Sequence, residues 1–190
     1  MKLFYLAFAG VLYLASFAGD AFAQSGDHTL TIQLKNGPVV IQLAPDVAPK
    51  HVAQIEALAK RGAYDNVSFH RVIEGFMAQT GDVQYGNMEK GFDPSLAGTG
   101  GSDMPNIPAE FSKTPFVRGT VGMARSQDPN SANSQFFIMF ADGAFLNGQY
   151  TVVGKVVSGM ENVDKIKMGD EANNGSVTDP DRMISVKVGK

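Results

Sequence analysis

Two stretches of the sequence place polar groups among large apolar side chains. Residues 69–82 hold one arginine, Arg71, and one glutamine, Gln79, between aromatic, aliphatic and methionine side chains. Residues 133–138 add further amides and two adjacent phenylalanines. Neither stretch contains an obvious nucleophile. A permanent cation, amides and an apolar surface without an attacking group favour catalysis of a rotation about a bond over the making of a bond.

The composition is that of one globular domain. The chain has 190 residues, of which 44% are hydrophobic, enough for a sizeable core. Its formal net charge is −3 and no run of Lys and Arg could follow a phosphate backbone, so we expect no nucleic-acid partner. The absence of cysteine excludes disulfides and thiolate metal sites. The chemistry suggested above requires neither a metal nor a cofactor.

Residues 1–23 predict a secretory signal peptide. They combine a short basic start, an apolar run and the small-x-small sequence of residues 21–23, where cleavage would leave residues 24–190 as the mature domain. The alternative is a membrane anchor, but a span needs about 20 apolar residues, and Asp20 interrupts the run. We therefore expect an exported, periplasmic protein with no membrane span in the mature chain.

A β-hairpin is predicted at the start of the mature domain. Apolar residues alternate with polar ones in residues 30–34 and again in residues 39–43, and Asn36-Gly37 between them is a strong hairpin sequence. A two-residue turn at that dipeptide pairs residue 34 with 39, 32 with 41 and 30 with 43. All six apolar side chains then share one face.

Two helices are predicted from apolar periodicity and end residues. The first begins near Pro49 and ends at Gly62, with an inward stripe of Val52, Ile55 and Leu58. The second begins at Ser158, where Glu161 completes a capping box, and ends at Gly169. Its inward residues are Met160, Val163 and Ile166.

Short apolar runs separated by turns make up most of the remaining chain. Strands are predicted at residues 67–73, 76–81, 119–124, 135–140, 151–157 and 184–188. Many short strands with two helices are typical of a mainly β fold, a closed antiparallel β-barrel capped by two α-helices.

Two loops resemble ligand sites at first sight. Residues 98–101 are rich in glycine, but no strand leads in and the spacing of a dinucleotide-binding motif is not met, so a long ordered loop over residues 83–111 is the better interpretation. Asp128 and Asn130 lack the ligand spacing and closing glutamate of a calcium loop. We interpret both segments as plain loops, the first bordering a site.

Three blocks together resemble a known family. Phe69-His70-Arg71-Val72-Ile73 with Gly75-Phe76-Met77 and Gln79, then residues 98–101, then Ser134-Gln135-Phe136-Phe137-Ile138 closely resemble the cyclophilin family of peptidyl-prolyl cis-trans isomerases. The resemblance covers nearly all of residues 24–190. It implies an eight-stranded β-barrel capped by two helices, with the active site on one outer face.

The resemblance also implies site residues. Arg71 would be the catalytic arginine, with Gln79 and Phe76 beside it. The substrate-binding positions would be Met77, Gly98, Ala124, Arg125, Ser126, Gln135, Phe137, Phe145, Leu146 and Tyr150. Phe145 stands where many relatives have tryptophan and Tyr150 where many eukaryotic members have histidine, which predicts weak cyclosporin binding with turnover retained. The residues alone leave open whether Gln79 contacts substrate or stabilises the fold.

Strand alternation assigns faces to neighbouring residues. Phe136 and Phe137 must point to opposite sides, so Phe136 is predicted in the core and Phe137 in the pocket wall. The same reasoning turns His70 inward, opposite Arg71, as a structural histidine with satisfied hydrogen bonds. His51, on the first helix, is predicted to be a solvated surface residue.

Two functions remain to be weighed. The first is a prolyl isomerase that assists the folding of exported proteins, acting as a monomer on proline-containing peptides. The second is a binding module that holds Xaa-Pro segments without useful turnover. The joint presence of Arg71, Phe76, Met77, Gln79 and Phe137 favours the enzyme.

Overall fold

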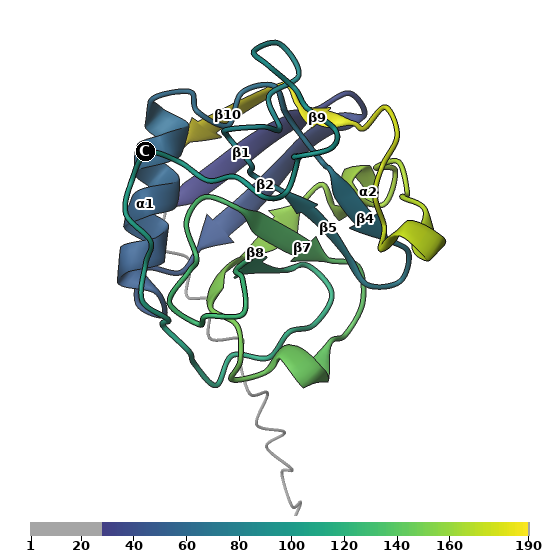
Figure 1. Cartoon of the computed structure of the whole chain (residues 1–190). Coiled ribbons are helices and arrows are strands. Elements are labelled where there is room, and N and C mark those ends of the chain that lie inside the picture. The colour runs from purple at the N-terminus through teal and green to yellow at the C-terminus, as the bar shows by residue number, and fades with distance from the viewer. Residues whose placement is uncertain (1–27, 190) are drawn as a thin grey trace, which may run out of the picture.

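Residues 28–189 are described by the computed structural model, and an eight-stranded antiparallel sheet organises them (Figure 1). The strands are β1 (Thr29–Leu34), β2 (Gly37–Leu43), β3 (Val67–Ser68), β4 (Arg71–Ile73), β5 (Met77–Thr80), β6 (Thr120–Met123), β7 (Phe136–Met139), β8 (Val152–Ser158), β9 (Arg182–Met183) and β10 (Ser185–Val188). The helices are α1 (Pro49–Lys60) and α2 (Met160–Val163), with 3-10 turns η1 (Ala144–Leu146) and η2 (Glu171–Asn173). The predicted mainly β fold with two helices is confirmed. The predicted signal peptide lies outside the described residues.

The sheet curls into most of a barrel but does not close on itself. Its strand order is β10-β1-β2-β8-β6-β7-β5-β4, which makes β10 and β4 the two edges. β3 and β9, which lead into β4 and β10, pair with each other as a separate two-stranded sheet. Within residues 28–189 the edges themselves share no ladder, so the predicted closed barrel overstates the closure. The pairing of β3 with β9 connects the two edges instead.

The first hairpin forms with a register that differs from the predicted one. Ile32 pairs with Val39, Leu30 with Ile41, and Leu34 with Gly37, so the two turn residues are Lys35 and Asn36. The partner of each residue is thus shifted by two positions. Because side chains alternate with a period of two, this shift leaves all six apolar side chains on the predicted inner face.

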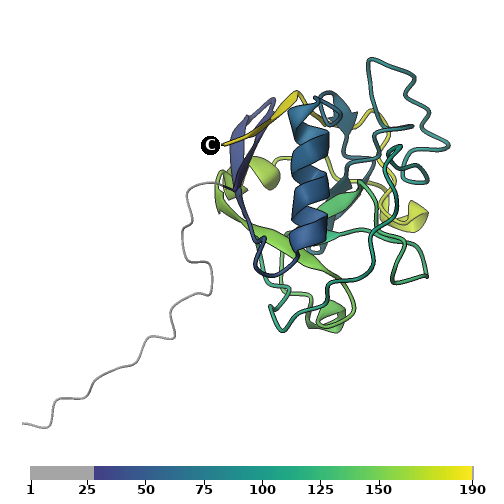
Figure 2. The ribbon, with the colours of Figure 1, turned by 90° about the vertical axis from the view of Figure 1, so that its left-hand side faces the viewer.

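Helix α1 begins at Pro49 as predicted and ends at Lys60, two residues before Gly62, and it has an unpredicted partner at its first turn. It stands upright against one side of the sheet, where it buries Val52, Ile55 and Leu58 (Figure 2). The amides of its second and third residues donate to the Glu110 carboxylate, at 3.2 and 3.1 Å. That carboxylate comes from the long loop and occupies the helix end, where peptide dipoles favour an anion.

The prediction that His51 is a solvated surface residue is wrong. Its side chain is fully buried, and its Nδ1 lies 2.6 Å from the Glu110 Oε2 atom. Burial lowers the pKa of His51, although the hydrogen bond that its ring makes to the Glu110 carboxylate acts in the opposite direction. The partner is 59 residues away along the chain, so helix periodicity could not indicate it.

Helix α2 is a single turn, shorter than predicted, and the predicted capping box does not form. Ser158 is the last residue of β8, and the turn is preceded by Gly159 with a φ of 85°. A Cβ atom at Gly159 would lie 2.2 Å from the Pro38 carbonyl oxygen, so a close backbone approach requires glycine there. Val163 and Ile166 are buried as predicted, whereas Met160 is only partly buried.

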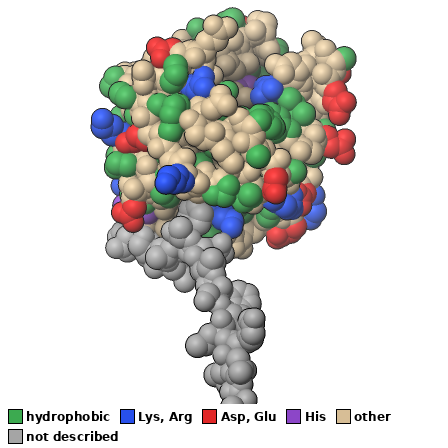
Figure 3. Space-filling view, turned by 90° about the horizontal axis from the view of Figure 1, so that it is seen from below, with side chains coloured by type: hydrophobic (Ala, Val, Ile, Leu, Met, Phe, Trp, Pro, Cys, Tyr) green, Lys and Arg blue, Asp and Glu red, His purple; other side chains and the backbone are tan. Residues whose placement is uncertain are grey.

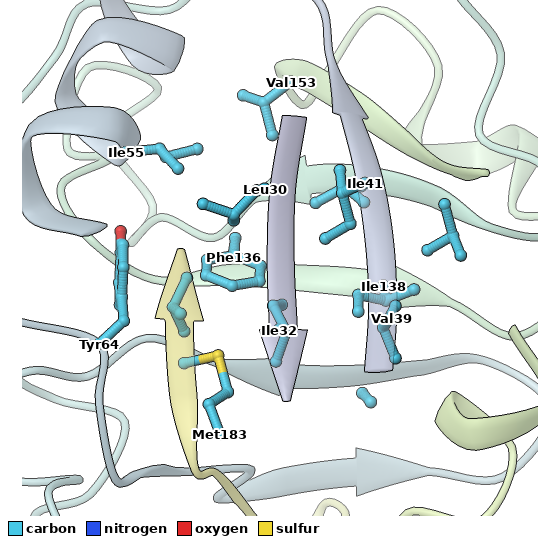
Figure 4. Packing of buried hydrophobic residues seen from close by; sticks show 14 of the residues in the cluster. Leu30, Ile32, Val39, Ile41, Ile55, Tyr64, Phe136, Ile138, Val153 and Met183 are labelled. Carbon is cyan, nitrogen blue, oxygen red and sulfur yellow. The ribbon is translucent and has the colours of Figure 1, made fainter. Parts of the chain in front are cut away.

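The main core lies inside the curled sheet. Figure 4 labels ten of its residues: Leu30, Ile32, Val39, Ile41, Ile55, Tyr64, Phe136, Ile138, Val153 and Met183. The Tyr64 ring meets the Phe136 ring edge-on at 5.6 Å, and its hydroxyl donates to the Ser134 carbonyl at 2.8 Å. This buried polar tip is therefore satisfied.

A second apolar cluster lies on the outer face of β5 and β7. Its buried members are Met77, Phe116, Phe137, Met139, Leu146 and Val152. Along β7 the side chains alternate between the two clusters, with Phe136 and Ile138 in the main core and Phe137 and Met139 in the second. The predicted separation of Phe136 from Phe137 is confirmed.

The surface carries charges of both signs. On the face shown in Figure 3, basic and acidic side chains are interspersed. Among residues 28–189, no helix has both the length and the apolar character needed to cross a bilayer.

Candidate active site

Most of the predicted site residues surround one hollow of about 450 Å³ over the second cluster. It is lined by Arg71, Phe76, Met77, Gln79, Ala124, Arg125, Phe137, Phe145, Leu146, Gln149 and Tyr150. Met77, Phe137 and Leu146 are nearly buried and form an apolar base. Gln149 was not among the predicted residues; it lies one position before Tyr150 in the same loop.

Sheet register places the key side chains in one row. Arg71 on β4 pairs with Gln79 on β5, Gln79 pairs with Phe137 on β7, and Phe137 pairs with Gly122 on β6. Directly paired residues project from the same face, so the row runs from a cation through an amide to an aromatic ring. A Cβ at Gly122 would lie 2.6 Å from the Phe137 ring, so glycine makes room for that ring.

The Arg71 guanidinium is held from two sides. Its Nη1 donates to Gln79 Oε1 at 3.2 Å and lies 3.8 Å from the Met77 sulfur. Its Nε and Nη2 donate to the backbone oxygen and the side-chain Oδ1 of Asn174, each at 3.0 Å. Burial lowers the pKa of Arg71, and Tyr150 opposes this effect. An arginine side chain nevertheless remains charged at neutral pH.

Two glutamine amides form a directional chain that starts at this arginine. Gln79 accepts from Arg71 and donates its Nε2 to Gln135 Oε1 at 2.9 Å. Gln135 in turn donates its Nε2 to the carbonyls of Gly98 and Gly100, at 3.0 and 2.7 Å. Arginine can only donate and carbonyls can only accept, so both ends of the chain fix the orientation of both amides.

A smaller, polar hollow of about 250 Å³ adjoins the first. It shares Gln79, Ala124 and Arg125 with it. Its other lining residues are Gly98, Thr99, Gly100, Ser126, Ser131, Asn133, Ser134 and Gln135. The structure therefore places the predicted residues Gly98, Ser126 and Gln135 in the polar hollow. Gln79, Ala124 and Arg125 line both this hollow and the apolar one.

The glycine loop of the polar hollow is fixed by a buried carboxylate that sequence reasoning missed. Asp82 is fully buried, and its Oδ2 accepts from the amides of Gly98 and Gly100, at 2.7 and 2.9 Å. Its Oδ1 accepts from the amides of Gln84 and Tyr85. Four N–H donors compensate the buried charge. An aspartate directly after a strand and before a glycine-rich loop is the sequence feature that could have indicated this role.

His70 lies beneath the same loop and points inward, as predicted. A Cβ at Gly98, whose φ is 99°, would lie 2.9 Å from the His70 ring. Burial lowers the pKa of His70 to about 4, partly offset by the Asp82 charge, so the ring is neutral at neutral pH. Neither ring nitrogen makes a hydrogen bond of good geometry among the described residues. The inward orientation is therefore confirmed, whereas the ring reaches the Ser68 backbone and the Gln135 side chain only with poor hydrogen-bond geometry.

The far wall of the apolar hollow is braced by Arg125 and Tyr150. The Arg125 guanidinium lies 4.3 Å from the centre of the Tyr150 ring, a cation–π contact, and it donates to the Ser126 and Gln149 carbonyls at 2.8 and 2.9 Å. The Tyr150 ring meets Phe137 edge-on at 6.0 Å. Arg125 thus joins two loops around the hollow and holds an aromatic ring against its base.

Phe145 stands at the rim. Its ring lies 5.4 Å from that of Phe76, and 65% of the residue is exposed. An exposed aromatic side chain at the mouth of a hollow is available to a ligand. In the described part of the chain, no three His, Asp or Glu side chains gather as they would around a metal ion.

Comparison with known proteins identifies the family. Residues 29–188 match the family described as cyclophilin type peptidyl-prolyl cis-trans isomerase/CLD. The chain belongs to the cyclophilin family and is a peptidyl-prolyl cis-trans isomerase. Of the two functions weighed from the sequence, the enzyme is therefore confirmed.

Bacterial relatives share much of the sequence. The chain is 67% identical over 168 residues to a Brucella suis protein named "Probable peptidyl-prolyl cis-trans isomerase", covering 88% of this chain and 86% of that one. It is 37% identical over 146 residues to peptidyl-prolyl cis-trans isomerase B of Escherichia coli, covering 73% and 83%.

Solved cyclophilin structures share the fold. A cyclophilin of Hirschia baltica is similar with a TM-score of 0.69 and 26% identity, over 85% of this chain and 73% of that one. A cyclophilin-type isomerase of Cryptosporidium parvum, solved in the presence of the dipeptide Ala-Pro, gives a TM-score of 0.68 and 26% identity over 85% and 99%.

Proposed function

We propose that Arg71 and the apolar hollow stabilise the half-rotated state of an Xaa-Pro peptide bond. Resonance keeps this bond planar and imposes a rotation barrier of about 18–20 kcal/mol. Rotation breaks the conjugation and returns a lone pair to the proline nitrogen, which can then accept a hydrogen bond. A donor at that nitrogen binds the twisted state more strongly than the planar one, and this difference accelerates the rotation.

The shape and burial of the hollow support the binding of a proline ring. Met77, Phe137 and Leu146 are at most 6% exposed, so their positions are fixed by packing before any substrate arrives. The hollow offers about 450 Å³, within the size range of small-ligand sites. This geometry favours a mechanism in which the hollow holds the proline ring still while the preceding carbonyl rotates.

The hydrogen bonds of Arg71 leave donors for a substrate. Arginine has five N–H groups, and three of those of Arg71 have oxygen acceptors among the described residues, from Gln79 and Asn174. A further contact reaches only the weakly accepting Met77 sulfur. Donor capacity therefore remains on the Nη atoms, on a guanidinium that is already oriented.

The directional amide chain bears on the role of Gln79. Both ends of its amide are engaged inside the protein, by Arg71 and by Gln135. This favours a role in fixing the arginine over a role in binding the substrate backbone. The adjoining polar hollow, with Gln135 and Gly98, would receive the residues that precede proline.

The required magnitude is within reach of such a site. An acceleration on the order of 10⁵ corresponds to about 7 kcal/mol. Single preorganised donors contribute about 3–4 kcal/mol in other enzymes. One arginine would then supply about half, with positioning in the apolar hollow supplying the rest. Neither an acid–base pair nor a covalent intermediate is needed.

Substitution of Arg71 tests this mechanism. Isomerisation of an Ala-Pro peptide is measured by a protease-coupled assay and by NMR exchange in the parent, in Arg71→Ala and in Arg71→Lys. We expect Arg71→Ala to lower kcat/KM at least about a hundredfold with the fold intact by circular dichroism. Arg71→Lys should recover little, because a lysine cannot present the same planar fork. Normal turnover by a folded Arg71→Ala variant would refute the mechanism.

We further propose that the enzyme is exported to the periplasm as a monomer and assists the folding of exported proteins. The signal-like residues 1–23 motivate this proposal, and uncatalysed prolyl isomerisation is slow enough to limit folding. Cell fractionation would place the protein, and light scattering would give its mass. Retention in the cytoplasm of a bacterial host would contradict the cellular role while leaving the chemistry intact.

A further inference from the structure

The open edge of β4 is covered by a segment from the end of the chain. Val72 donates its amide to the Gly175 carbonyl at 2.8 Å and accepts from the Gly169 amide at 2.9 Å. The Val177 amide donates to the His70 carbonyl at 3.1 Å. Residues 169–177, the edge loop, thus lie against the edge that the sheet leaves unpaired.

Within the edge loop, Asn174 has a backbone conformation suited to its contacts. It follows η2 with a φ of 55°, in the left-handed region that asparagine tolerates better than most residues. Its neighbour Gly175 donates to the Asp170 carbonyl at 2.8 Å, which closes the loop on itself. In this conformation the carbonyl and the side-chain oxygen of Asn174 both face Arg71, each accepting at 3.0 Å.

We propose that Asn174 is a positioning residue for Arg71. This inference rests on the proposed role of Arg71 in catalysis. Asn174 holds the Nε and Nη2 side of the guanidinium, and Gln79 holds the Nη1 side. Two anchors on opposite edges of a planar group restrict its rotation, so its remaining donors keep one direction.

The arrangement predicts which kinetic constant depends on Asn174. Arginine has a long side chain with several rotatable bonds, and ordering it costs conformational entropy. When the anchor is present, that entropy is lost during folding and not during the reaction. A substrate binds mainly through the apolar hollow, which Asn174 does not line. Loss of the anchor should therefore lower kcat and leave KM nearly unchanged.

Asn174→Gly isolates the side-chain contact. Glycine adopts the left-handed conformation without strain and keeps the backbone carbonyl, so only the bond from Nη2 is lost. Asn66→Gly is the matched control, because Asn66 also has a positive φ, of 64°, but its amide binds Glu89 and not the arginine. We expect kcat on an Ala-Pro peptide to fall about tenfold in Asn174→Gly, the size of one hydrogen bond to a charged group. The control should match the parent.

Two further measurements separate positioning from loosened structure. The guanidinium ¹⁵N spectrum of Arg71 should show slowed rotation about the Nε–Cζ bond in the parent and in Asn66→Gly, and faster rotation in Asn174→Gly. In an Arg71→Ala background, Asn174→Gly should have no further effect on the residual rate. A purely structural role would lower the folded fraction and spare kcat per folded molecule.

The outcomes are distinguishable. If the parent turns over substrate and Arg71→Ala is impaired, an unchanged kcat in folded Asn174→Gly overturns the role of Asn174 alone. An equal loss in the Arg71→Ala background, or a change confined to KM, also overturns it. If instead folded Arg71→Ala is as active as the parent, the proposed mechanism itself fails, and the role of Asn174 with it.

Discussion

The buried histidine beneath the glycine loop makes a quantitative prediction about stability. Burial lowers the pKa of His70 from 6.5 to about 4 in the folded protein. Between these two values the unfolded chain binds a proton that the folded protein does not, so the free energy of unfolding decreases as the pH falls. The loss begins near pH 6.5 and levels off below about pH 4. It reverses when the pH is raised again.

The size of this effect follows from the same values. Each pH unit of difference corresponds to about 1.4 kcal/mol, so His70 alone should account for about 3 kcal/mol over the window. Only 7% of the residue is exposed, so solvent screening does little to reduce the figure. This is a large share of the stability of a domain of ordinary size.

Urea unfolding at a series of pH values measures the contribution of His70 to the free energy of unfolding. The free energy of unfolding is determined from pH 8 to pH 4 for the parent and for His70→Leu, which removes the titrating group. The difference between the two curves isolates His70, because His51, whose pKa burial also lowers, and the acidic groups are common to both proteins. A difference that does not change with pH, or an NMR titration of His70 near 6.5, would refute the reasoning.

Three further substitutions test other parts of the site. Asp82→Asn keeps the shape of the side chain but turns an amide NH₂ toward backbone N–H donors. We expect the free energy of unfolding, measured in urea, to fall by about 3 kcal/mol. An unchanged value would contradict the role of the carboxylate. Gly122→Ala places a Cβ against the Phe137 and Phe116 rings, which should cost about 1–3 kcal/mol and lower kcat/KM on an Ala-Pro peptide. Phe145→Trp adds an indole N–H at the exposed rim. We expect it to tighten cyclosporin binding, measured by calorimetry, about tenfold. Equal affinities of the parent and the variant would show that this donor does not limit binding.

Local pattern was sufficient for much of the fold. Alternation assigned Phe136 and Phe137 to opposite faces, and the two apolar clusters show that assignment. The inner face of the first hairpin was also correct, although its register was not. The face to which a side chain points depends only on whether it occupies an odd or an even position of its strand, and the apolar alternation shows this. The register depends on the turn, whose two residues are Lys35 and Asn36 instead of the predicted Asn36 and Gly37.

Long-range contacts were beyond the reach of the pattern. Glu110 meets His51 across 59 residues, and that contact turned an expected surface histidine into a buried one. Asp82 and Asn174 hold the site through backbone groups and loop conformation, for which a single sequence carries little information. The resemblance to a family assigned the residues that line the hollow. It did not indicate the residues behind them that fix their positions.

The contact between Arg71 and Asn174 joins residues 103 positions apart, and the sheet places its first strand next to its last. Domains with many such distant pairings fold slowly, since long stretches must be brought together before the pairings contribute stability. A nascent chain that ends before residue 174 would contain every residue that lines the apolar hollow but would lack this anchor of Arg71. We therefore expect the isomerase to acquire full activity only after the edge loop has been synthesised and has packed against β4.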